Sequence, residues 1–523
     1  MLVCGAASAL GFAPLGWWPV WVGAVACFLV SLSQAPWQRQ WWLGWVFGLG
    51  AATATTHWIG VALWQGIPKG AAVGATAIAW LYCAWPWGLV GMLSGALRRY
   101  PLDQHCGPSN SVSRLACLTS VLVVAWWSQA WWLSGFPWLV PGAVWLDTPL
   151  QGWGPVGGGL LMAAMGLWLA AALAWGWQTQ QALRAKRIPK TWRTWQGVAL
   201  VWVGVFGTGT ALQRMAWTEA TVQPVRVGVV QADIPLTDQL PPGQLEAYQR
   251  MAWRISLALI SRHDVNVVVW PEGMVSTEES PLRAWLTQNG SVLRQTALVM
   301  GALIREPQAP AALTGTAVRS PHPKAHNSLL AHGPGSGGRY DKRELVPLVE
   351  SWPERGPWPM MADWASSRPW IQPGAAVQTP LVLAGQQVGA SICYEDAFAH
   401  VYQGLPATVS WLINASDDGW FANSPAMPAQ HLALSRLRAL EQRKPLVRSA
   451  NIGPSAVVGA WGEIITQTGT GKPQMLHADI QPRQGHTPYA RWGHTWLWAM
   501  VLLVVCTACL WRIRRKNRPL TAD

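Results

Sequence analysis

The chain has 523 residues, a formal net charge of +14, and 51% hydrophobic residues. Its basic residues gather in short loops and in the C-terminal tail, while only Asp103 and Asp147 are acidic before residue 216. This distribution argues against nucleic-acid binding, which uses a basic patch on one face of a folded domain. The composition instead predicts a membrane protein with one water-soluble part.

Hydrophobic stretches long enough to cross a bilayer, which takes roughly 20 residues, occur along the chain. They lie at residues 17–33, 41–63, 70–96, 115–135, 156–178, 195–215 and 494–512. A shorter apolar segment at 2–13 has no Lys or Arg ahead of it, so it does not resemble a cleavable signal peptide. We therefore expect an N-terminal transmembrane helical bundle at 1–215 and a C-terminal transmembrane helix at 494–512.

The charges of the short loops predict the orientation of the chain. Basic residues occupy alternate loops and the tail, at Arg39; at Arg98, Arg99 and Arg114; at Arg184, Lys186, Arg187, Lys190 and Arg193; and at Arg512, Arg514, Arg515, Lys516 and Arg518. The intervening short loops carry only Lys69. Because basic loops stay in the cytoplasm, we expect a basic cytoplasmic tail at 513–523 and an extracytoplasmic domain between the last two spans.

The block at 223–485 predicts alternating strands and helices. Residues 225–231 alternate as a strand does, and 244–262 have the apolar spacing of an amphipathic helix. Further strands are expected at 265–270, 297–304, 326–332, 388–393, 408–414, 446–450 and 454–459, and a helix at 428–443. A block of about 260 residues with this alternation predicts a mixed α/β domain with one substantial core.

Three residues suited to acyl-transfer chemistry follow predicted strands of this domain. Pro271 stops an apolar strand, so Glu272 emerges at its carboxyl end. Lys342 follows Gly338–Asp341, and Cys393, the only cysteine of the domain, ends an apolar run. A carboxylate can take the proton of a thiol to give a thiolate, and a lysine can stabilise the oxyanion of the tetrahedral intermediate that the thiolate forms with a carbonyl group. Each signal alone is weak, because a lone cysteine is more often an inert core residue.

The order of these motifs resembles the nitrilase superfamily. W-P-E at 270–272, Y-x-K-x-x-L-V-P at 340–347 and C-Y-E at 393–395 match its Glu-Lys-Cys triad. That triad lies at strand ends of an αββα sandwich. The match continues through Asn414–Phe421, Gln430-His431 and Arg438–Glu441. A nitrilase domain between transmembrane helices is similar to the apolipoprotein N-acyltransferase family, whose eight spans would include the short segment at 2–13.

The resemblance implies a phospholipid-dependent acyltransferase of lipoprotein biosynthesis in the bacterial inner membrane, with its catalytic domain on the periplasmic side. Cys393 would be the nucleophile, Glu272 the general base and acid, and Lys342 the stabiliser of the oxyanion. The residues that would shape and polarise the site are Glu350, Tyr394 and Glu395.

In the reaction that this family implies, the thiolate takes an acyl chain from a phospholipid as a thioester. The α-amine of the diacylglyceryl cysteine of an apolipoprotein then attacks that thioester. A thioester suits this chemistry because it conserves acyl-transfer potential while the first product leaves. No metal and no diffusible cofactor is implied, and we expect a monomer that binds no nucleic acid.

The segment Pro347–Ser367 is apolar yet punctuated by prolines, which disfavours a regular element. Two interpretations remain open: the segment packs over the domain's own core, or it is a mobile lid that guides an acyl chain toward the thiol. The lid's membrane-facing side chains would include Trp358, Met360 and Met361. One departure from the family is the missing tryptophan after Gln231–Pro235, which concerns substrate contacts rather than the triad.

Two other functions are compatible with the sequence. A membrane-tethered amidase or nitrilase would pass its thioester to water, and it would need an open, polar site. A non-catalytic membrane scaffold or transporter would carry a decayed nitrilase domain. Against the scaffold, all three triad positions are filled, and the expected spans contain no acidic residue for an ion relay.

His431 is a further polar residue on the predicted helix at 428–443. The sequence around it shows no cluster of His, Cys or carboxylate residues with metal-ligand spacing. We therefore expect a structural hydrogen-bonding role for His431 and no metal site.

Overall fold

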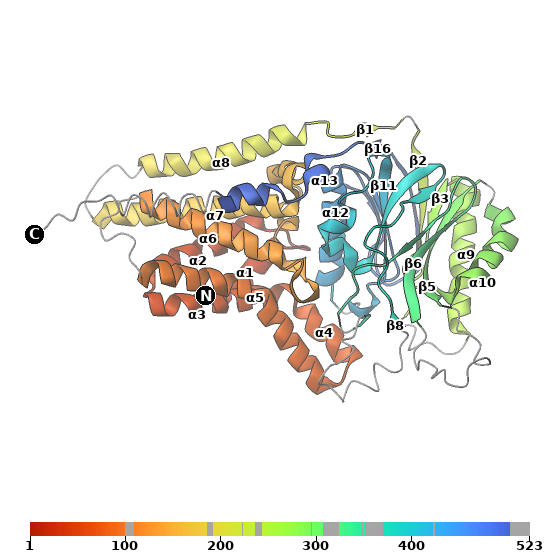
Figure 1. The fold of residues 1–523 in the computed structure, drawn as a ribbon, viewed down its shortest axis with the longest axis horizontal. Coiled ribbons are helices and arrows are strands. Elements are labelled where there is room, and N and C mark those ends of the chain that lie inside the picture. Colours follow the sequence, from red (N-terminus) through yellow and green to blue (C-terminus); the bar gives the residue numbers. More distant parts are fainter. Residues whose placement is uncertain are drawn as a thin grey trace, which may run out of the picture. The chain divides into compact units, whose positions relative to one another are not determined.

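The computed structural model describes residues 1–99, 109–185, 192–221, 223–235, 243–293, 295–306, 324–347, 349–350, 370–421 and 424–502. The chain forms two compact units, and Figure 1 follows both along the sequence. The first unit contains Met1–Thr55, Ile78–Met215 and Trp492–Asp523, and the second contains Thr56–Ala77 and Ala216–Arg491.

The first unit is built from helices. They are α1 Leu2–Ser8, α2 Trp18–Gln34, α3 Trp37–Thr55, most of α5 Lys69–Arg99, α6 Ser109–Ser128, α7 Gly154–Ala185 and α8 Trp192–Gln213. Within the described residues, three stretches are single helices long and apolar enough to cross a membrane: Lys69–Leu97, Pro149–Ala185 and Trp192–Gln213. Shorter apolar helices include α2 and Val112–Ser128. These elements fit the predicted membrane domain.

Glycines and aromatic rings pack the first unit. A Cβ atom on Gly44 of α3 would lie 2.2 Å from the carbonyl oxygen of Trp87 in α5, so only glycine permits this approach. The ring of Phe47 in α3 stacks on Phe28 at 4.7 Å and lies 4.6 Å from the ring of Trp87. Close backbone approach through small residues is typical of helix packing in membranes.

The stretch expected as one span at 41–63 consists of two helices. Helix α3 ends at Thr55, and Thr56 leaves the helical region with φ −118° and ψ 29°. Helix α4, His57–Gly66, then continues at a bend of 57°. Both halves are apolar, so hydropathy alone predicts one helix and does not reveal the backbone break.

Helix α4 belongs to the second unit, although it lies far from the rest of that unit in sequence. The indole of Trp58 packs edge-on against Phe421 with ring centroids 5.0 Å apart. Its Nε1 donates to Oε1 of Gln430 at 3.2 Å, and Trp58 is 4% exposed. The second half of a predicted span therefore packs against the second unit instead of continuing α3.

The second unit contains two large β-sheets. The eight-stranded sheet has the order β15-β2-β3-β5-β6-β7, with β4 beside β5 and β8 beside β6. Its strands are β2 Val225–Gln231, β3 Val267–Val269, β4 Val275–Glu278, β5 Ala297–Arg305, β6 Lys324–His332, β7 Arg339–Asp341, β8 Trp370–Ile371 and β15 Gln474–Ile480.

The six-stranded sheet has the order β14-β13-β12-β11-β10-β9. Its strands are β9 Leu381–Leu383, β10 Gln386–Ile392, β11 Val409–Ser416, β12 Leu446–Ala450, β13 Ala456–Val458 and β14 Ile464–Gln467. Strands β1 Glu219–Ala220 and β16 Arg483–Gln484 form a separate pair. Strands β10, β11 and β12 are parallel, so their carboxyl ends meet at one edge of the sheet.

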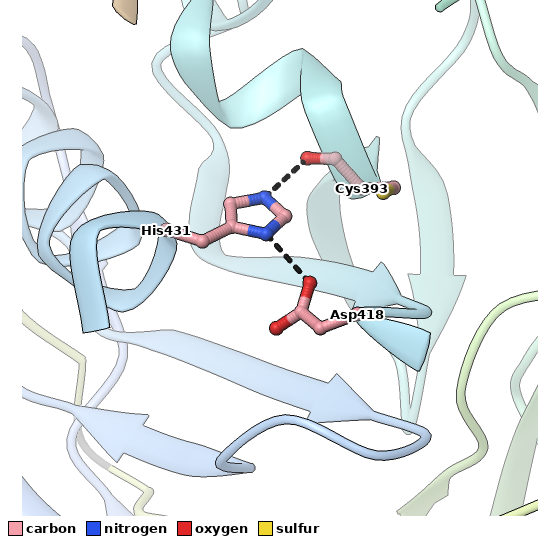
Figure 2. A group of neighbouring side chains, drawn as sticks. All are labelled: Cys393, Asp418 and His431. Carbon is pink, nitrogen blue, oxygen red and sulfur yellow. Dashed lines mark hydrogen bonds and ion pairs between the residues drawn. The ribbon is translucent and has the colours of Figure 1, made fainter. Parts of the chain in front are cut away.

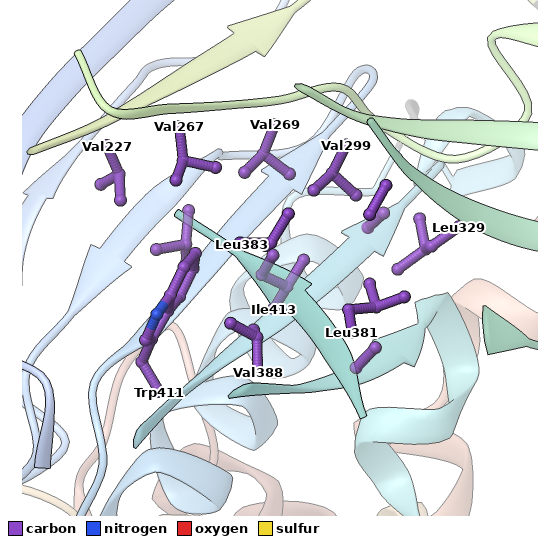
Figure 3. Packing of buried hydrophobic residues seen from close by; sticks show 14 of the residues in the cluster. Val227, Val267, Val269, Val299, Leu329, Leu381, Leu383, Val388, Trp411 and Ile413 are labelled. Carbon is purple, nitrogen blue, oxygen red and sulfur yellow. The ribbon is translucent and has the colours of Figure 1, made fainter. Parts of the chain in front are cut away.

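The two sheets pack face to face. The valines and leucines between them come from both sheets, as Figure 3 shows for Val227, Val269 and Val299 on one side and Val388 and Ile413 on the other. Helices α9 Gln244–His263 and α10 Glu279–Asn289 contact the eight-stranded sheet, and α12 Ala426–Gln442 contacts the six-stranded sheet (Figure 1). This is the predicted αββα sandwich.

Candidate active site

Glu272 lies just beyond the carboxyl end of β3, as the sequence predicts. Gly273 follows with φ +69°, a conformation that glycine adopts without strain. The turn lies tightly against β5, because a Cβ atom on Gly301 would be 2.0 Å from the carbonyl oxygen of Pro271. The glycine at 301 therefore allows the turn to hold the Glu272 carboxylate at the sheet edge.

Lys342 follows β7 and is fully buried. Its Nζ atom lies 3.0 Å from Oε1 of Glu272 and 2.8 Å from Oε1 of Glu350. Burial alone would lower the pKa of Lys342, but Glu272 and Glu350 raise it well above its ordinary value. The site therefore holds a permanent positive charge beside two carboxylates.

Asn327 on β6 completes this group and was not anticipated from the sequence. Its Nδ2 donates to Oε1 of Glu272 at 2.7 Å and to Oε1 of Glu350 at 3.0 Å. The backbone N–H of Val346 donates to the other oxygen of Glu350 at 2.9 Å. The only sequence signal for Asn327 was an amide side chain within the predicted strand at 326–332. Such a residue is also common at a strand end, so it did not single out a site residue.

Cys393 follows β10 and begins a short 3₁₀ turn, Cys393–Ala397. Burial raises the pKa of its thiol well above the ordinary value, and the charge of Glu272 raises it further, while Lys342 lowers it. The thiol is therefore neutral in the resting site. A base must remove its proton before it can attack, and Glu272 is a carboxylate available for that task.

The structure brings Glu272, Lys342 and Glu350 into direct contact, and Cys393 lies close enough for the charges of Glu272 and Lys342 to shift the pKa of its thiol. Tyr394 is buried, and its ring packs edge-on against Phe398 at 5.0 Å. The predicted lid residues and the region of the missing tryptophan lie outside the described residues. The lid residues in question are Trp358, Met360 and Met361, and the region of the missing tryptophan is 236–240.

Glu395 holds the backbone around the site. Its carboxylate accepts from the backbone N–H groups of Arg343 at 2.7 Å and Ile392 at 2.7 Å, and from the hydroxyl of Tyr340. Burial raises the pKa of Glu395 to about 7, although these backbone donors lower it. The carboxylate therefore fixes the chain next to Lys342 and the strand that ends at Cys393.

Known proteins resemble both parts of the chain. A carbon-nitrogen hydrolase from Helicobacter pylori G27 has a TM-score of 0.36 and 16% identity, covering 56% of this chain and 95% of that chain. The carbon-nitrogen hydrolase family model matches residues 226–489, and the model of the apolipoprotein N-acyltransferase N-terminal domain matches residues 4–172.

Full-length relatives decide the family. An apolipoprotein N-acyltransferase from Pseudomonas syringae pv. tomato is 30% identical over 533 residues, covering 96% of this chain and 94% of the relative. One from Azotobacter vinelandii is 29% identical over 535 residues, covering 99% of this chain and 96% of the relative. The chain belongs to the apolipoprotein N-acyltransferase family. This confirms the resemblance that the motifs predict.

In this member of the apolipoprotein N-acyltransferase family, Asp417 also contacts Glu272. Its backbone N–H donates to Oε2 of Glu272 at 2.9 Å, so both carboxylate oxygens of Glu272 are held. Burial raises the pKa of the Asp417 side chain to about 7, the Gly419 N–H lowers it, and the charge of Glu272 raises it. A carboxyl group with a raised pKa therefore lies next to Glu272.

A buried histidine, His431, contacts the backbone of Cys393 in this apolipoprotein N-acyltransferase family member. Cys393, Asp418 and His431 each offer one possible metal-ligand atom, and these atoms lie within 4.8 Å of one another. Sequence spacing did not reveal this group, because the three residues lie far apart in the chain. Both ring nitrogens of His431 already have protein partners, Asp418 Oδ1 at 2.8 Å and the Cys393 carbonyl oxygen at 2.9 Å (Figure 2).

Proposed function

We propose that the chain transfers an acyl chain from a membrane phospholipid, through a thioester on Cys393, to the α-amino group of the N-terminal diacylglyceryl cysteine of apolipoproteins. Membership of the apolipoprotein N-acyltransferase family supports this substrate pair. The observation that carries the chemistry is the buried Lys342 ammonium, held between Glu272 and Glu350 beside the thiol.

In the first half-reaction, Glu272 takes the proton from Sγ of Cys393, and the thiolate attacks the ester carbonyl of the phospholipid. The charge that develops on the carbonyl oxygen is stabilised by the Lys342 ammonium. The tetrahedral intermediate collapses, the carbon–oxygen bond breaks, and protonated Glu272 returns its proton to the departing lysophospholipid alkoxide. The product is a thioester on Cys393.

In the second half-reaction, the α-amine of the apolipoprotein attacks the thioester carbonyl. Glu272 takes a proton from the attacking nitrogen, and Lys342 again stabilises the oxyanion. Collapse breaks the carbon–sulfur bond, the thiolate recovers its proton from Glu272, and an amide is released. The two half-reactions share one site, which corresponds to a ping-pong mechanism.

The same proposal places the protein in the bacterial inner membrane as a multi-pass monomer with residues 223–485 in the periplasm. The support is the alternation of basic and nearly uncharged loops. An alkaline phosphatase reporter fused after residue 485 should be active, and one fused after residue 190 should be inactive. The opposite result would contradict the orientation.

Intact-protein mass measurement after incubation with phospholipid tests the function. We expect a hydroxylamine-labile acyl adduct on Cys393, and its transfer to the amine of an added diacylglyceryl cysteine peptide. Release of free fatty acid without acylation of the peptide would instead show a hydrolase. A protein that forms no adduct and acylates no peptide would indicate a non-catalytic membrane scaffold.

A further inference from the structure

The backbone of Cys393 is in an unfavourable conformation. Its φ is +52°, in the left-handed region, whereas Ile392 before it is extended at φ −125° and ψ 119°. A residue with a Cβ atom rarely adopts this region, because the Cβ crowds the following carbonyl group. Such a conformation persists only where neighbouring groups hold it, so the contacts of the Cys393 peptide group are informative.

The carbonyl oxygen of Cys393 accepts hydrogen bonds from two side chains. Nε2 of His431 lies 2.9 Å away, and Nδ2 of Asn414 lies 3.4 Å away. Figure 2 shows that the carbonyl oxygen, and not the sulfur, is directed at the imidazole. A carbonyl oxygen only accepts, so Nε2 of His431 is the donor in this bond.

The second nitrogen of His431 is held so that Nε2 keeps its hydrogen. Nδ1 lies 2.8 Å from Oδ1 of Asp418 and 3.1 Å from Nη2 of Arg448. It can donate to the carboxylate when the ring is protonated, or accept from the guanidinium when the ring is neutral. In both states Nε2 retains the hydrogen that it donates to the Cys393 carbonyl.

Arg448 supports both donors of the Cys393 carbonyl. Its Nη2 donates to Oδ2 of Asp418 at 2.7 Å, and its Nη1 donates to Oδ1 of Asn414 at 2.6 Å. The side chains of Arg448, Asp418 and His431 are fully buried. Burial alone would raise the pKa of Asp418, but Arg448 and His431 lower it to about 2, so the carboxylate is charged.

The strand register explains why Arg448 can reach Asn414 and the residues around it. Asn414 on β11 pairs with Arg448 on β12, and Ser391 on β10 pairs with Asn414. Side chains at paired positions of adjacent strands lie on the same face of a sheet. Helix α12, which contacts β12, carries His431. Nδ2 of Asn414 also donates to Oγ of Ser391 on β10 at 2.9 Å. The network is therefore anchored on three strands and one helix, with Asp418 just after β11.

We propose that His431 is a positioning residue that holds the Cys393 peptide group and thereby aims the thiol. A peptide group is planar, so fixing the carbonyl of Cys393 also fixes its ψ angle and the direction in which the side chain leaves the backbone. His431 takes no proton from the thiol in this role. The inference rests on the proposed function, because it assigns Cys393 as the nucleophile.

A matched pair of variants tests this role. His431→Gln and His431→Asn introduce the same amide group, but the Asn side chain is one methylene shorter and does not reach the Cys393 carbonyl. We expect His431→Asn to lower the kcat of acyl-enzyme formation about 100-fold, the scale of a small misplacement of a reacting group. His431→Gln should recover at least tenfold of that loss. KM for phospholipid should stay unchanged in both.

Two further measurements separate positioning from general damage. The first is the pH profile of Cys393 alkylation by iodoacetamide. It should keep its shape in His431→Gln, because Nε2 of His431 donates in both ring states. The second is thermal unfolding, which should be cooperative in both variants. If His431→Asn does not fold, Asp418→Asn gives the same readout with His431 in place. Equal kcat in wild type and in a folded His431→Asn or Asp418→Asn variant would overturn the inference. Acylation by Cys393→Ala would instead overturn the proposed function itself.

Discussion

The Nζ atom of Lys342 lies 3.0 Å from Oε1 of Glu272, although 70 positions separate the two residues in sequence. Both oxygens of that glutamate have partners, since the backbone N–H of Asp417 donates to Oε2 at 2.9 Å. A carboxylate held in this way has a fixed orientation. In the proposed mechanism, rigid placement of Glu272 as the base and of Lys342 as the oxyanion stabiliser would allow one site to run two acyl transfers in sequence.

Replacement of the proposed nucleophile, Cys393, gives the first prediction. Cys393→Ala should abolish both half-reactions, and Cys393→Ser nearly so, because a carboxylate ionises an alcohol much less readily than a thiol. The measurement is N-acylation of a diacylglyceryl cysteine peptide, with Cys27→Ala as the control, since Cys27 lies in α2. Normal acylation by Cys393→Ala protein would contradict the mechanism.

The second prediction concerns the base. Glu272→Gln should block thioester formation, because an amide cannot take the thiol proton. The exposed Glu278 on β4 offers a matched control, and Glu278→Gln should leave the rate unchanged. The rate of adduct formation is followed by intact-protein mass. A normal rate in Glu272→Gln would show that another group removes the proton.

A third prediction addresses the oxyanion. Lys342→Ala should lower the rate of acyl transfer by roughly 10²–10³, the scale of losing one oxyanion stabiliser. It should also lower stability, because Glu272 and Glu350 would lose their shared partner. Thermal unfolding therefore accompanies the rate measurement, and exposed Lys324 provides the control variant Lys324→Ala. A folded Lys342→Ala protein with the normal rate would remove the lysine from the mechanism.

Asp417 makes stability depend on pH. Its folded-state pKa is raised from 3.8 to about 7, so the folded protein binds this proton more tightly than the unfolded chain. The resulting stabilisation is fully present below about pH 4 and is lost as pH rises through about 7. Asp417→Asn should remove that component from the thermal midpoint measured across pH 4 to 8.

The control for this pH prediction is Asp264→Asn, because the Asp264 side chain is fully exposed. That variant should follow the wild-type curve. If Asp417→Asn also followed the wild-type curve, the raised pKa assigned to Asp417 would be wrong.

The fifth prediction concerns helix α4. Trp58→Ala removes the contact with Phe421 and the hydrogen bond to Gln430, and truncating a buried Trp costs about 3–5 kcal/mol. We expect a lower thermal midpoint and faster hydrogen exchange in peptides that contain Phe421 and Gln430. Trp64→Ala on the same helix is the control, because Trp64 is 51% exposed. Unchanged exchange in Trp58→Ala would show that α4 does not stabilise this region.

Local sequence determined much of the second unit. Alternation of apolar and polar residues predicts β2 at 225–231 with its observed bounds, and helical spacing predicts α9 within one residue at its C-terminal end. The positions of Glu272 and Cys393 at strand ends could be predicted for the same reason. Each depends on where one apolar run stops, which is a property of neighbouring residues.

Edge strands were harder to predict from the sequence than central strands. Strand β15 has mostly exposed or half-buried residues, and it joins the sheet only by pairing antiparallel with β2. Its sequence carries no long apolar run that would separate it from a loop. The partner strand, more than 240 residues earlier in the chain, decides its conformation through backbone hydrogen bonds.

The polar contacts around the thiol were decided by the tertiary structure alone. Asn327 reaches Glu272 from β6, and Asp418, His431 and Arg448 meet beside the Cys393 backbone from three separate parts of the chain. A hydrogen bond depends on distance and direction between atoms, and sequence spacing records neither for residues on different elements. Strand order and register bring these groups within reach of one another. The place of α4 in the second unit was also decided by the tertiary structure. The apolar character of Trp58 predicts that it is buried, but not against which partner.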